Sequence, residues 1–240
     1  MTKAMRAALV ICAMAQAANV NAQENAVFDA AVRASLLRNP DVVLEVFKIL
    51  EEQQNTKAVQ QDIGLIEKYS DELFGNIDIE TPVLVEFVDY QCGYCRRAHS
   101  ETLLLLEQHP TVTIVQKQFP ILGPKSVELA ERMLAIKTVH GDVVFQEMND
   151  ALMGDDGRIA ATFDDYITAQ GLDAFKIREV ATSEEVQAEI SATHALARAL
   201  SISGTPGFVS RTKIIRGFSE VEGLEVAVFG RGILAAKESE

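Results

Sequence analysis

Residues 83–97 read Val-Leu-Val-Glu-Phe-Val-Asp-Tyr-Gln-Cys-Gly-Tyr-Cys-Arg-Arg. In the first six residues, odd- and even-numbered positions alike are apolar, except for Glu86. This pattern is typical of a central strand covered by helices on both faces. Cys92 and Cys95 follow at the expected start of a helix. A buried strand that leads directly into a helix predicts an α/β sheet.

The position of the two cysteines predicts a redox-active dithiol. Cys92 lies where the free N–H groups and the dipole of a helix N-terminus stabilise a thiolate, and such positions lower a thiol pKa from about 8.5 to about 3.5–7.5. Arg96 and Arg97 add positive charge. Cys95 lies one turn further along the same helical face, within reach of a disulfide. An exposed thiol that attacks and a buried thiol that resolves are what thiol–disulfide exchange requires.

Two other roles for this dithiol remain open from the residues alone. An inert disulfide would close a very small loop and contribute little stability. With His99, the cysteines resemble half of a zinc site, but no second Cys-x-x-Cys or His pair completes it, so we expect neither a metal centre nor a cofactor. A non-catalytic module that holds Cu(I) or a partner protein through the dithiol is a minor alternative.

Composition narrows the class of protein further. The chain has 240 residues, 48% of them apolar, which is enough for one large or two small domains with a core. Its 35 acidic and 22 basic residues give a net charge of −13. A protein that binds nucleic acid by neutralising phosphates needs the opposite sign, so we expect no nucleic-acid partner.

Residues 1–22 predict a secretory signal peptide. Lys3 and Arg6 precede an apolar run that is too short to span a membrane, and small residues at Val20 and Ala22 indicate cleavage after Ala22. Cleavage would remove Cys12 and leave only the Cys-x-x-Cys pair. We therefore expect a soluble protein in an oxidising compartment, the periplasm.

Residues 23–76 predict a helical, polar arm. Asn39, Pro40 and Asp41 have the order of a capping residue, a first helical position and a dipole-compatible acid. A shorter helix with Phe28 and Val32 precedes them. The stripe that follows has helical spacing and consists of Val42, Val43, Val46, Phe47 and Leu50. We expect this arm to join copies of the chain into a homo-oligomer; the alternative is an arm that folds back on its own domain.

Residues 77–240 predict one α/β domain with an insertion. Strands at 83–88 and 111–119 flank a helix, and residues from about 124 to 202 read as a helical insert with breaks at glycines. Thr182 and Glu185 have the spacing of a capping box for its last helix. Short strands around Phe208 and Ile214 and a final helix from about Ser219 complete the order β-α-β, helical insert, β-β-α.

Glu86 is a candidate acid–base residue. It shares strand parity with Leu84 and Val88, so its side chain should point into the protein beneath the helix that carries the cysteines. Burial there would raise its pKa and suit it to shuttle a proton for Cys95. The alternative is a strand residue that faces solvent.

These features together resemble the DsbA family of exported thioredoxin-fold oxidoreductases. The resemblance covers residues 81 to about 235 and includes the Glu-Phe-Val-Asp-Tyr-Gln strand end, the Cys-Gly-Tyr-Cys helix start and the late Gly-Thr-Pro. It implies a thioredoxin-like α/β fold, a nucleophile at Cys92 and a resolving thiol at Cys95. It also implies a cis-proline at Pro206, and a backbone at Thr205 that binds the substrate chain. The implied partners are cysteine-containing exported proteins and a membrane redox protein that resets the dithiol.

Two positions depart from the family pattern. Gly207 replaces a side chain that would continue the strand, and residues 210–213 lack the Asn-Gly or Asp-Gly of a tight hairpin, so the edge of the sheet is in question. The polar arm resembles the ScsC-like subgroup, which includes oligomeric disulfide isomerases. We therefore favour an oligomeric isomerase or reductase over a monomeric oxidase of the DsbA type.

Overall fold

The computed structural model describes residues 28–154 and 156–230, so the predicted signal peptide lies outside the described residues. The chain divides into two compact units, Met1–Ala58 and Val59–Glu240. The unit that holds the dithiol therefore begins earlier than the expected boundary at residue 77. The physical reason is that Ile66, Leu73 and Phe74 are buried in the core of the second unit.

The described part of the first unit is helical and exposed. Residues 28–38 form one helix, and α2 (Asp41–Lys68) begins after a short break and continues into the second unit. Asn39 donates its side-chain N–H to Ser35 O at 3.0 Å, so it ends the first helix instead of capping the second as expected. Every described residue of this unit except Ala34 is exposed.

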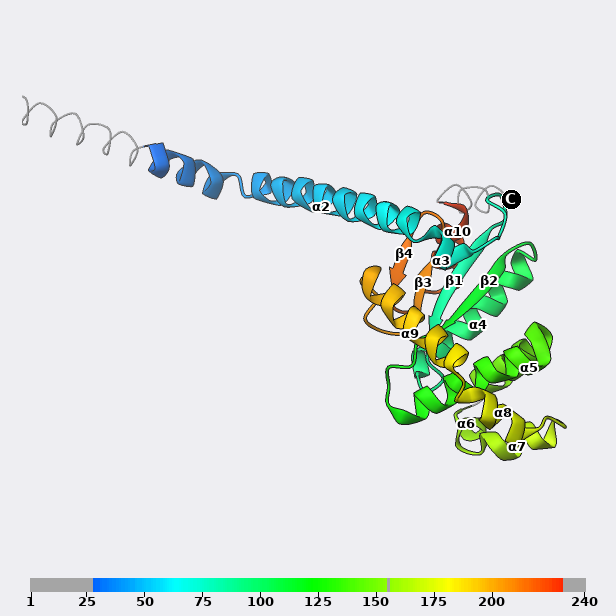
Figure 1. The fold of residues 1–240 in the computed structure, drawn as a ribbon. Coiled ribbons are helices and arrows are strands. Elements are labelled where there is room, and N and C mark those ends of the chain that lie inside the picture. Colours follow the sequence, from blue (N-terminus) through cyan, green and yellow to red (C-terminus); the bar gives the residue numbers. More distant parts are fainter. Residues whose placement is uncertain (1–27, 155, 231–240) are drawn as a thin grey trace, which may run out of the picture. The chain divides into compact units, whose positions relative to one another are not determined.

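The second unit is built on a four-stranded mixed sheet (Figure 1). Its strands are β1 (Val83–Val88), β2 (Thr113–Gln118), β3 (Gly207–Val209) and β4 (Ile214–Arg216), in the order β2-β1-β3-β4. β1 pairs parallel with β2 and antiparallel with β3, and β4 pairs antiparallel with β3. The predicted order β-α-β, helical insert, β-β-α is confirmed, and this is the expected thioredoxin-like arrangement.

Helices cover both faces of β1, as its apolar pattern predicts. The odd-numbered face packs against the end of α2, α3 (Ser70–Phe74) and α9 (Glu184–Ala199). The even-numbered face packs against α4 (Gly93–Gln108) and α10 (Val221–Phe229), where Leu84 meets Ala98 and Leu105. All six residues of β1 are buried. Full burial of the strand that leads into Cys92 fixes the position of the dithiol.

The two departures from the family pattern have local explanations. A Cβ atom at Gly207 would lie 2.8 Å from the Ile202 side chain, so glycine permits the close approach of β3 to this residue. The β3–β4 hairpin closes without an Asn-Gly turn because the Ser210 hydroxyl accepts the backbone N–H groups of Thr212 and Lys213 at 3.2 and 3.1 Å. The sheet edge therefore forms despite both departures.

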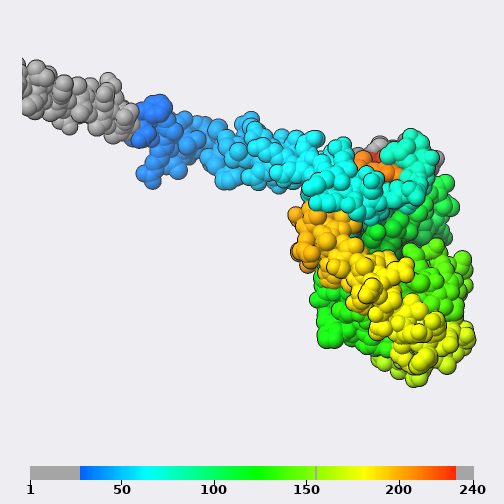
Figure 2. Space-filling model, viewed as in Figure 1, coloured from blue at the N-terminus to red at the C-terminus, as the bar shows by residue number. Residues whose placement is uncertain are grey.

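The helical insert consists of α5 (Pro124–Gly154), α6 (Arg158–Ala161), α7 (Phe163–Ala169) and α8 (Ala174–Ala181), followed by α9. In Figure 2 the green to yellow surface of these helices is continuous with α9. Gly141 breaks α5 with a φ of 81°, as its glycine predicts. The cap of α9 is Ser183, whose hydroxyl accepts Val186 N–H; Thr182 instead donates to Glu179 O, so the expected Thr182 cap is wrong by one residue.

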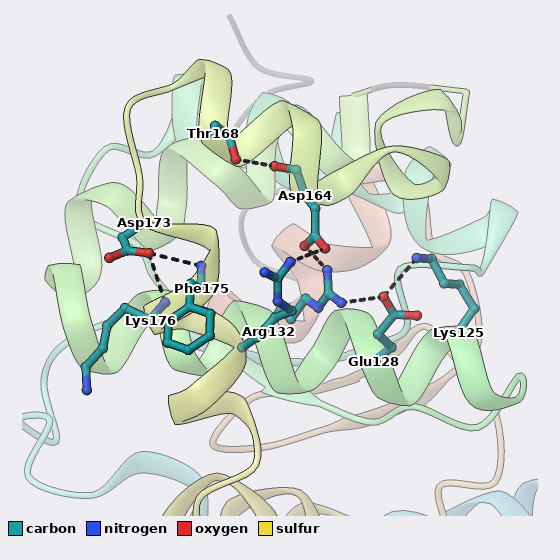
Figure 3. Close-up of polar contacts among 9 residues, drawn as sticks. Lys125, Glu128, Arg132, Asp164, Thr168, Asp173, Phe175 and Lys176 are labelled. Carbon is teal, nitrogen blue, oxygen red and sulfur yellow. Dashed lines mark hydrogen bonds and ion pairs between the residues drawn. The ribbon is translucent and has the colours of Figure 1, made fainter.

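Charged side chains join three helices of this insert (Figure 3). Asp164 of α7 accepts hydrogen bonds from Arg132 of α5 and, at 2.7 Å, from Arg178 of α8. Arg132 also pairs with Glu128 at 2.9 Å. Because Asp164 holds two arginines from different helices, it fixes the insert as a unit next to the cysteines.

Candidate active site

The chain leaves β1 and turns into α4 at the dithiol. Cys92 is the N-cap of α4, with φ −82° and ψ 114°, and Cys95 lies in the first turn. The backbone N–H of Cys92 donates to Asp89 O at 3.0 Å, which closes the turn between strand and helix. Both cysteines are present as thiols. Cys92 exposes 7% of its surface and Cys95 none. Cys92 is therefore the more accessible of the two, although it is largely buried.

The surroundings of the sulfurs separate their pKa values. A hydrogen bond from the Cys95 thiol is the main cause that lowers the pKa of Cys92 to about 5, helped by the Thr205 side chain and by the backbone N–H groups of Cys95 and Tyr94. The same contact, together with burial, raises the pKa of Cys95 above its usual range. Backbone N–H groups at the helix N-terminus thus contribute to the lowered pKa of Cys92, but less than the Cys95 thiol does.

The arginines after the motif make contacts of their own. Arg96 donates to the backbone carbonyl of Tyr90 at 3.2 Å, and the Arg97 guanidinium lies over aromatic rings. The pKa of Cys92 is lowered by hydrogen bonds to its sulfur.

The Thr205–Pro206 segment lies directly against Cys92, although it is more than a hundred residues away in sequence. Its peptide bond is cis, as the family resemblance implied. The Cys92 sulfur lies 3.3 Å from the carbonyl oxygen of Thr205, which can accept the thiol hydrogen. Thr205 is half-buried and Pro206 is buried. The structure thus brings the Thr205–Pro206 segment to the dithiol of Cys92 and Cys95.

Glu86 is buried, with 1% of its surface exposed, so the alternative of a solvent-facing side chain is wrong. Burial raises its pKa to about 7, and a hydrogen bond with Gln116 opposes that shift. Its Oε2 is buried without a hydrogen-bond partner among the described residues. Val88, two positions along the same face, packs in the cluster that contains Cys95. Negative charge on Glu86 or on Cys95 contributes to raising the pKa of the Tyr90 hydroxyl.

Two groups near the dithiol were not found from the sequence. The Asp89 carboxylate is 1% exposed and accepts backbone N–H groups from Gln91, Ile121 and Leu122 at 2.8, 2.8 and 3.0 Å. It therefore clamps the turn before Cys92 to the loop after β2. An Asp directly after a strand is a known turn former, and this signal was available.

The second group is a buried hydrogen-bond chain. Gln118 of β2 donates to the Tyr90 hydroxyl at 3.1 Å, and that hydroxyl donates to Asn149 of α5 at 3.2 Å. Tyr90 packs in the same cluster as both cysteines. The chain connects the sheet to the helical insert beside Cys95. No local pattern predicts partners so distant in sequence.

His99 does not turn toward the cysteines as a ligand would. Its Nε2 lies 3.5 Å from Asp150 Oδ1 on α5, and burial lowers its pKa.

Among residues 28–154 and 156–230, no helix combines the length and apolarity needed to cross a bilayer.

Comparisons with known proteins agree with this arrangement. The model of the DSBA-like thioredoxin domain family matches residues 83–229. A solved thioredoxin-like oxidoreductase from Silicibacter pomeroyi DSS-3 is 31% identical, with a TM-score of 0.59 over 71% of this chain and 98% of that one. Proteus mirabilis ScsC in a transitional conformation is 24% identical, with a TM-score of 0.55 over 90% and 99% of the two chains, which is a likeness of fold alone.

A curated relative, the Na(+)/H(+) antiporter NhaA 1 of Salinispora arenicola (strain CNS-205), is 28% identical over 153 residues. That match covers 62% of this chain, and the chain spans only 23% of the length of that relative. The family model, by contrast, covers most of the second unit, including Cys92, Cys95, Thr205 and Pro206. The chain belongs to the DSBA-like thioredoxin domain family.

Proposed function

We propose that this protein is an exported, oligomeric thiol–disulfide isomerase or reductase that acts on cysteine-containing exported proteins. The observation that carries the chemistry is the contact between the two sulfurs, in which the buried Cys95 thiol donates to a Cys92 sulfur with a pKa of about 5. At neutral pH, Cys92 is then a thiolate and Cys95 a neutral thiol. That is the protonation state of a nucleophile with its resolving partner.

The proposed exchange begins when the Cys92 thiolate attacks one sulfur of a client disulfide. A Cys92–client disulfide forms, and the second client sulfur leaves as a thiolate. In isomerisation, another client thiolate attacks the client sulfur of the mixed disulfide, which gives a new client disulfide and regenerates the Cys92 thiolate. In reduction, the Cys95 thiolate attacks Cys92 Sγ, which forms the Cys92–Cys95 disulfide and releases the client as a thiol.

Two further residues have roles in this proposal. Cys95 must lose its proton before it attacks, and Glu86, which is buried with a pKa of about 7, receives that proton. The Thr205 carbonyl lies against Cys92, and in this proposal it and the adjacent Pro206 hold the client backbone next to the sulfur. Glu86 is thus the proposed proton acceptor, and Thr205 and Pro206 are the proposed substrate-binding residues.

The arm supports the oligomer part of the proposal. Within the first unit, the stripe Val42, Val43, Val46, Phe47 and Leu50 leaves between 39% and 64% of each side chain in water. Burial of one such side chain contributes about 1.5–3 kcal/mol. A second copy of the same stripe is a complementary occupant, because identical apolar faces at helical spacing pack together in coiled coils. Several dithiols in one assembly would raise the concentration of nucleophile around a mispaired client.

One pair of assays tests the activity. The wild-type chain should restore activity to ribonuclease with scrambled disulfides, and Cys92→Ser should abolish this. A variant with Val46→Asp and Leu50→Asp should become monomeric by light scattering and lose at least most of the reshuffling. Asn55→Asp, which lies half a turn around the helix from Val46, is the matched control and should remain oligomeric. Monomeric wild-type protein would contradict the oligomer.

A monomeric oxidase of the DsbA type is the second candidate, and one observation favours it. A thiolate stabilised to a pKa of about 5 also stabilises the reduced form, which makes the Cys92–Cys95 disulfide an oxidant. A membrane redox protein would then restore the disulfide after each cycle. Faster oxidation of fully reduced ribonuclease than reshuffling of the scrambled form would favour this candidate.

A further inference from the structure

An arginine on the helix that begins at Cys92 contacts two aromatic rings. The Arg97 guanidinium carbon lies 4.5 Å from the ring centroid of Phe218 and 5.8 Å from that of Tyr94. The two rings are 6.4 Å apart and tilted by 49°. Tyr94 stands between the two cysteines in sequence and exposes 59% of its surface. Tyr94 and Arg97 therefore lie exposed on the helix that begins at the attacking cysteine.

Different parts of the fold fix this group. Tyr94 and Arg97 are in the first two turns of α4, and Phe218 is in the segment between β4 and α10. Glu101, one turn beyond Arg97, accepts the backbone N–H of Val221 at 3.0 Å and so ties α10 to α4. Phe218 is thereby positioned against Arg97.

Arg97 differs from the arginines that stabilise the fold. Arg132, Arg178 and Arg216 each pair with a carboxylate, and Arg96 donates to a backbone carbonyl. Within the described part of the chain, Arg97 is exposed and no carboxylate lies within ion-pair distance of it. In a chain with a net charge of −13, such an arginine on the active-site helix is free to bind an acidic ligand.

The chemistry of the guanidinium defines that ligand. The group contacts the two rings on one side and is exposed, so N–H donors remain for a ligand. Those donors match the two oxygens of a carboxylate, and contact with the rings reduces the side-chain entropy lost when they bind. Arg97 is five residues after Cys92, about 7.5 Å along the helix axis and about 140° around it, so its long side chain is what brings the guanidinium toward a client residue about two positions from the reacting cysteine.

We propose that Arg97, held by Tyr94 and Phe218, is a specificity residue that selects client segments with an Asp or Glu about two residues from the reacting cysteine. The inference rests on the proposed exchange at Cys92 and names the chemical class of client. An alternative role for the rings, as an apolar grip for any client, predicts no preference for charge and is an outcome of the test below.

The experiment uses Cys95→Ser protein, which retains mixed disulfides on Cys92. Three equimolar peptides with one cysteine, and with Asp, Asn or Lys two residues from it, compete for Cys92 under a thiol–disulfide buffer, and mass spectrometry counts each adduct. We expect the Asp peptide to exceed the Asn peptide by about 3- to 10-fold at low salt and the Lys peptide by more, with the preference reduced in 0.5 M salt. The intrinsic reactivity of each peptide thiol cancels when protein variants are compared.

Arg97→Gln in this background should bring the Asp-to-Asn ratio close to that of free thiols in the same buffer. Arg97→Lys should retain part of the preference, because it keeps the charge but loses the flat stack. The control Arg198→Gln removes one positive charge from an exposed position on α9 and should change nothing. Equal ratios in the parent protein and in Arg97→Gln would overturn the specificity role. If no peptide forms an adduct with Cys92, the proposed function itself fails, and this inference with it.

Discussion

Cys95 donates its thiol hydrogen to the sulfur of Cys92, and this one contact moves the pKa values of the two residues in opposite directions. The effect follows from depth, because Cys95 is wholly buried and cannot ionise easily, whereas Cys92 lies at the helix N-terminus. The hydrogen bond between the two sulfurs, the burial of Cys95 and the helix N-terminus at Cys92 together separate an attacking from a resolving thiol.

Removal of that hydrogen bond should raise the pKa of Cys92. In Cys95→Ala the main cause of the lowered value is absent, so the Cys92 pKa should move from about 5 toward its ordinary range. Cys95→Ser keeps an O–H donor, so its Cys92 pKa should lie between those of wild type and Cys95→Ala. Thiolate absorbance followed against pH measures the Cys92 pKa in each variant. An unchanged pKa in Cys95→Ala would show that the helix N-terminus alone stabilises the thiolate.

Glu86 should give the protein a stability that depends on pH. Its pKa is raised from 4.5 to about 7 on folding, so its contribution is fully present below about pH 4.5 and is lost as pH rises through about 7. Glu86→Gln cannot ionise and should be more stable than wild type at pH 9, by about 1–3 kcal/mol, with little difference at pH 4. Urea unfolding at the two pH values measures this. Equal stability at pH 9 would contradict a buried acid.

The same substitution should affect the reaction at one step only. Glu86→Gln should slow release of the mixed disulfide by Cys95 and leave the first attack by Cys92 nearly unchanged, because only Cys95 needs a proton acceptor. Rapid-quench kinetics between pH 5 and 8 separate the two steps. Unaltered rates of release over that range would remove Glu86 from the mechanism.

The position of a truncation should decide whether the second unit folds. A chain that begins at Val59 keeps Ile66, Leu73 and Phe74 in the core and should unfold cooperatively, whereas one that begins at Gly75 loses all three. Removal of a large buried side chain costs about 2–5 kcal/mol, and the usual total stability is about 5–15 kcal/mol. Circular dichroism and urea unfolding compare the two. Equal stability would place these side chains outside the core.

Much of the site could be predicted from local patterns. The parity of β1 placed Glu86 beneath α4, and the strand-to-helix transition placed Cys92 at the N-cap, because both depend on short-range geometry. The hydrogen-bond chain through Tyr90 and Asn149 could not be predicted, since its partners are 59 residues apart. The start of the second unit is hard to recognise in the sequence, because a long polar stretch of α2 precedes the few residues that reach the core.

Asp89 should stabilise the active-site turn. Asp89→Ala leaves three backbone N–H groups without their acceptor and should lower the free energy of unfolding by about 3 kcal/mol, with a matching fall in the rate of exchange. Asp78→Ala is the matched control, because Asp78 is exposed and accepts one backbone N–H, from Glu80; it should cost less than about 1 kcal/mol. Similar losses for both variants would deny Asp89 a special role.

The most direct test of this account is the ionisation of Cys92 in the reduced wild-type protein. The rate of alkylation by iodoacetamide, followed residue by residue with mass spectrometry from pH 3 to 10, reports the thiolate fraction at each cysteine. The structure predicts that Cys92 reacts first with a midpoint near pH 5 and that Cys95 stays unmodified throughout. A Cys92 midpoint near pH 8.5–9, or equal alkylation of both cysteines, would contradict a Cys92 thiolate as the nucleophile.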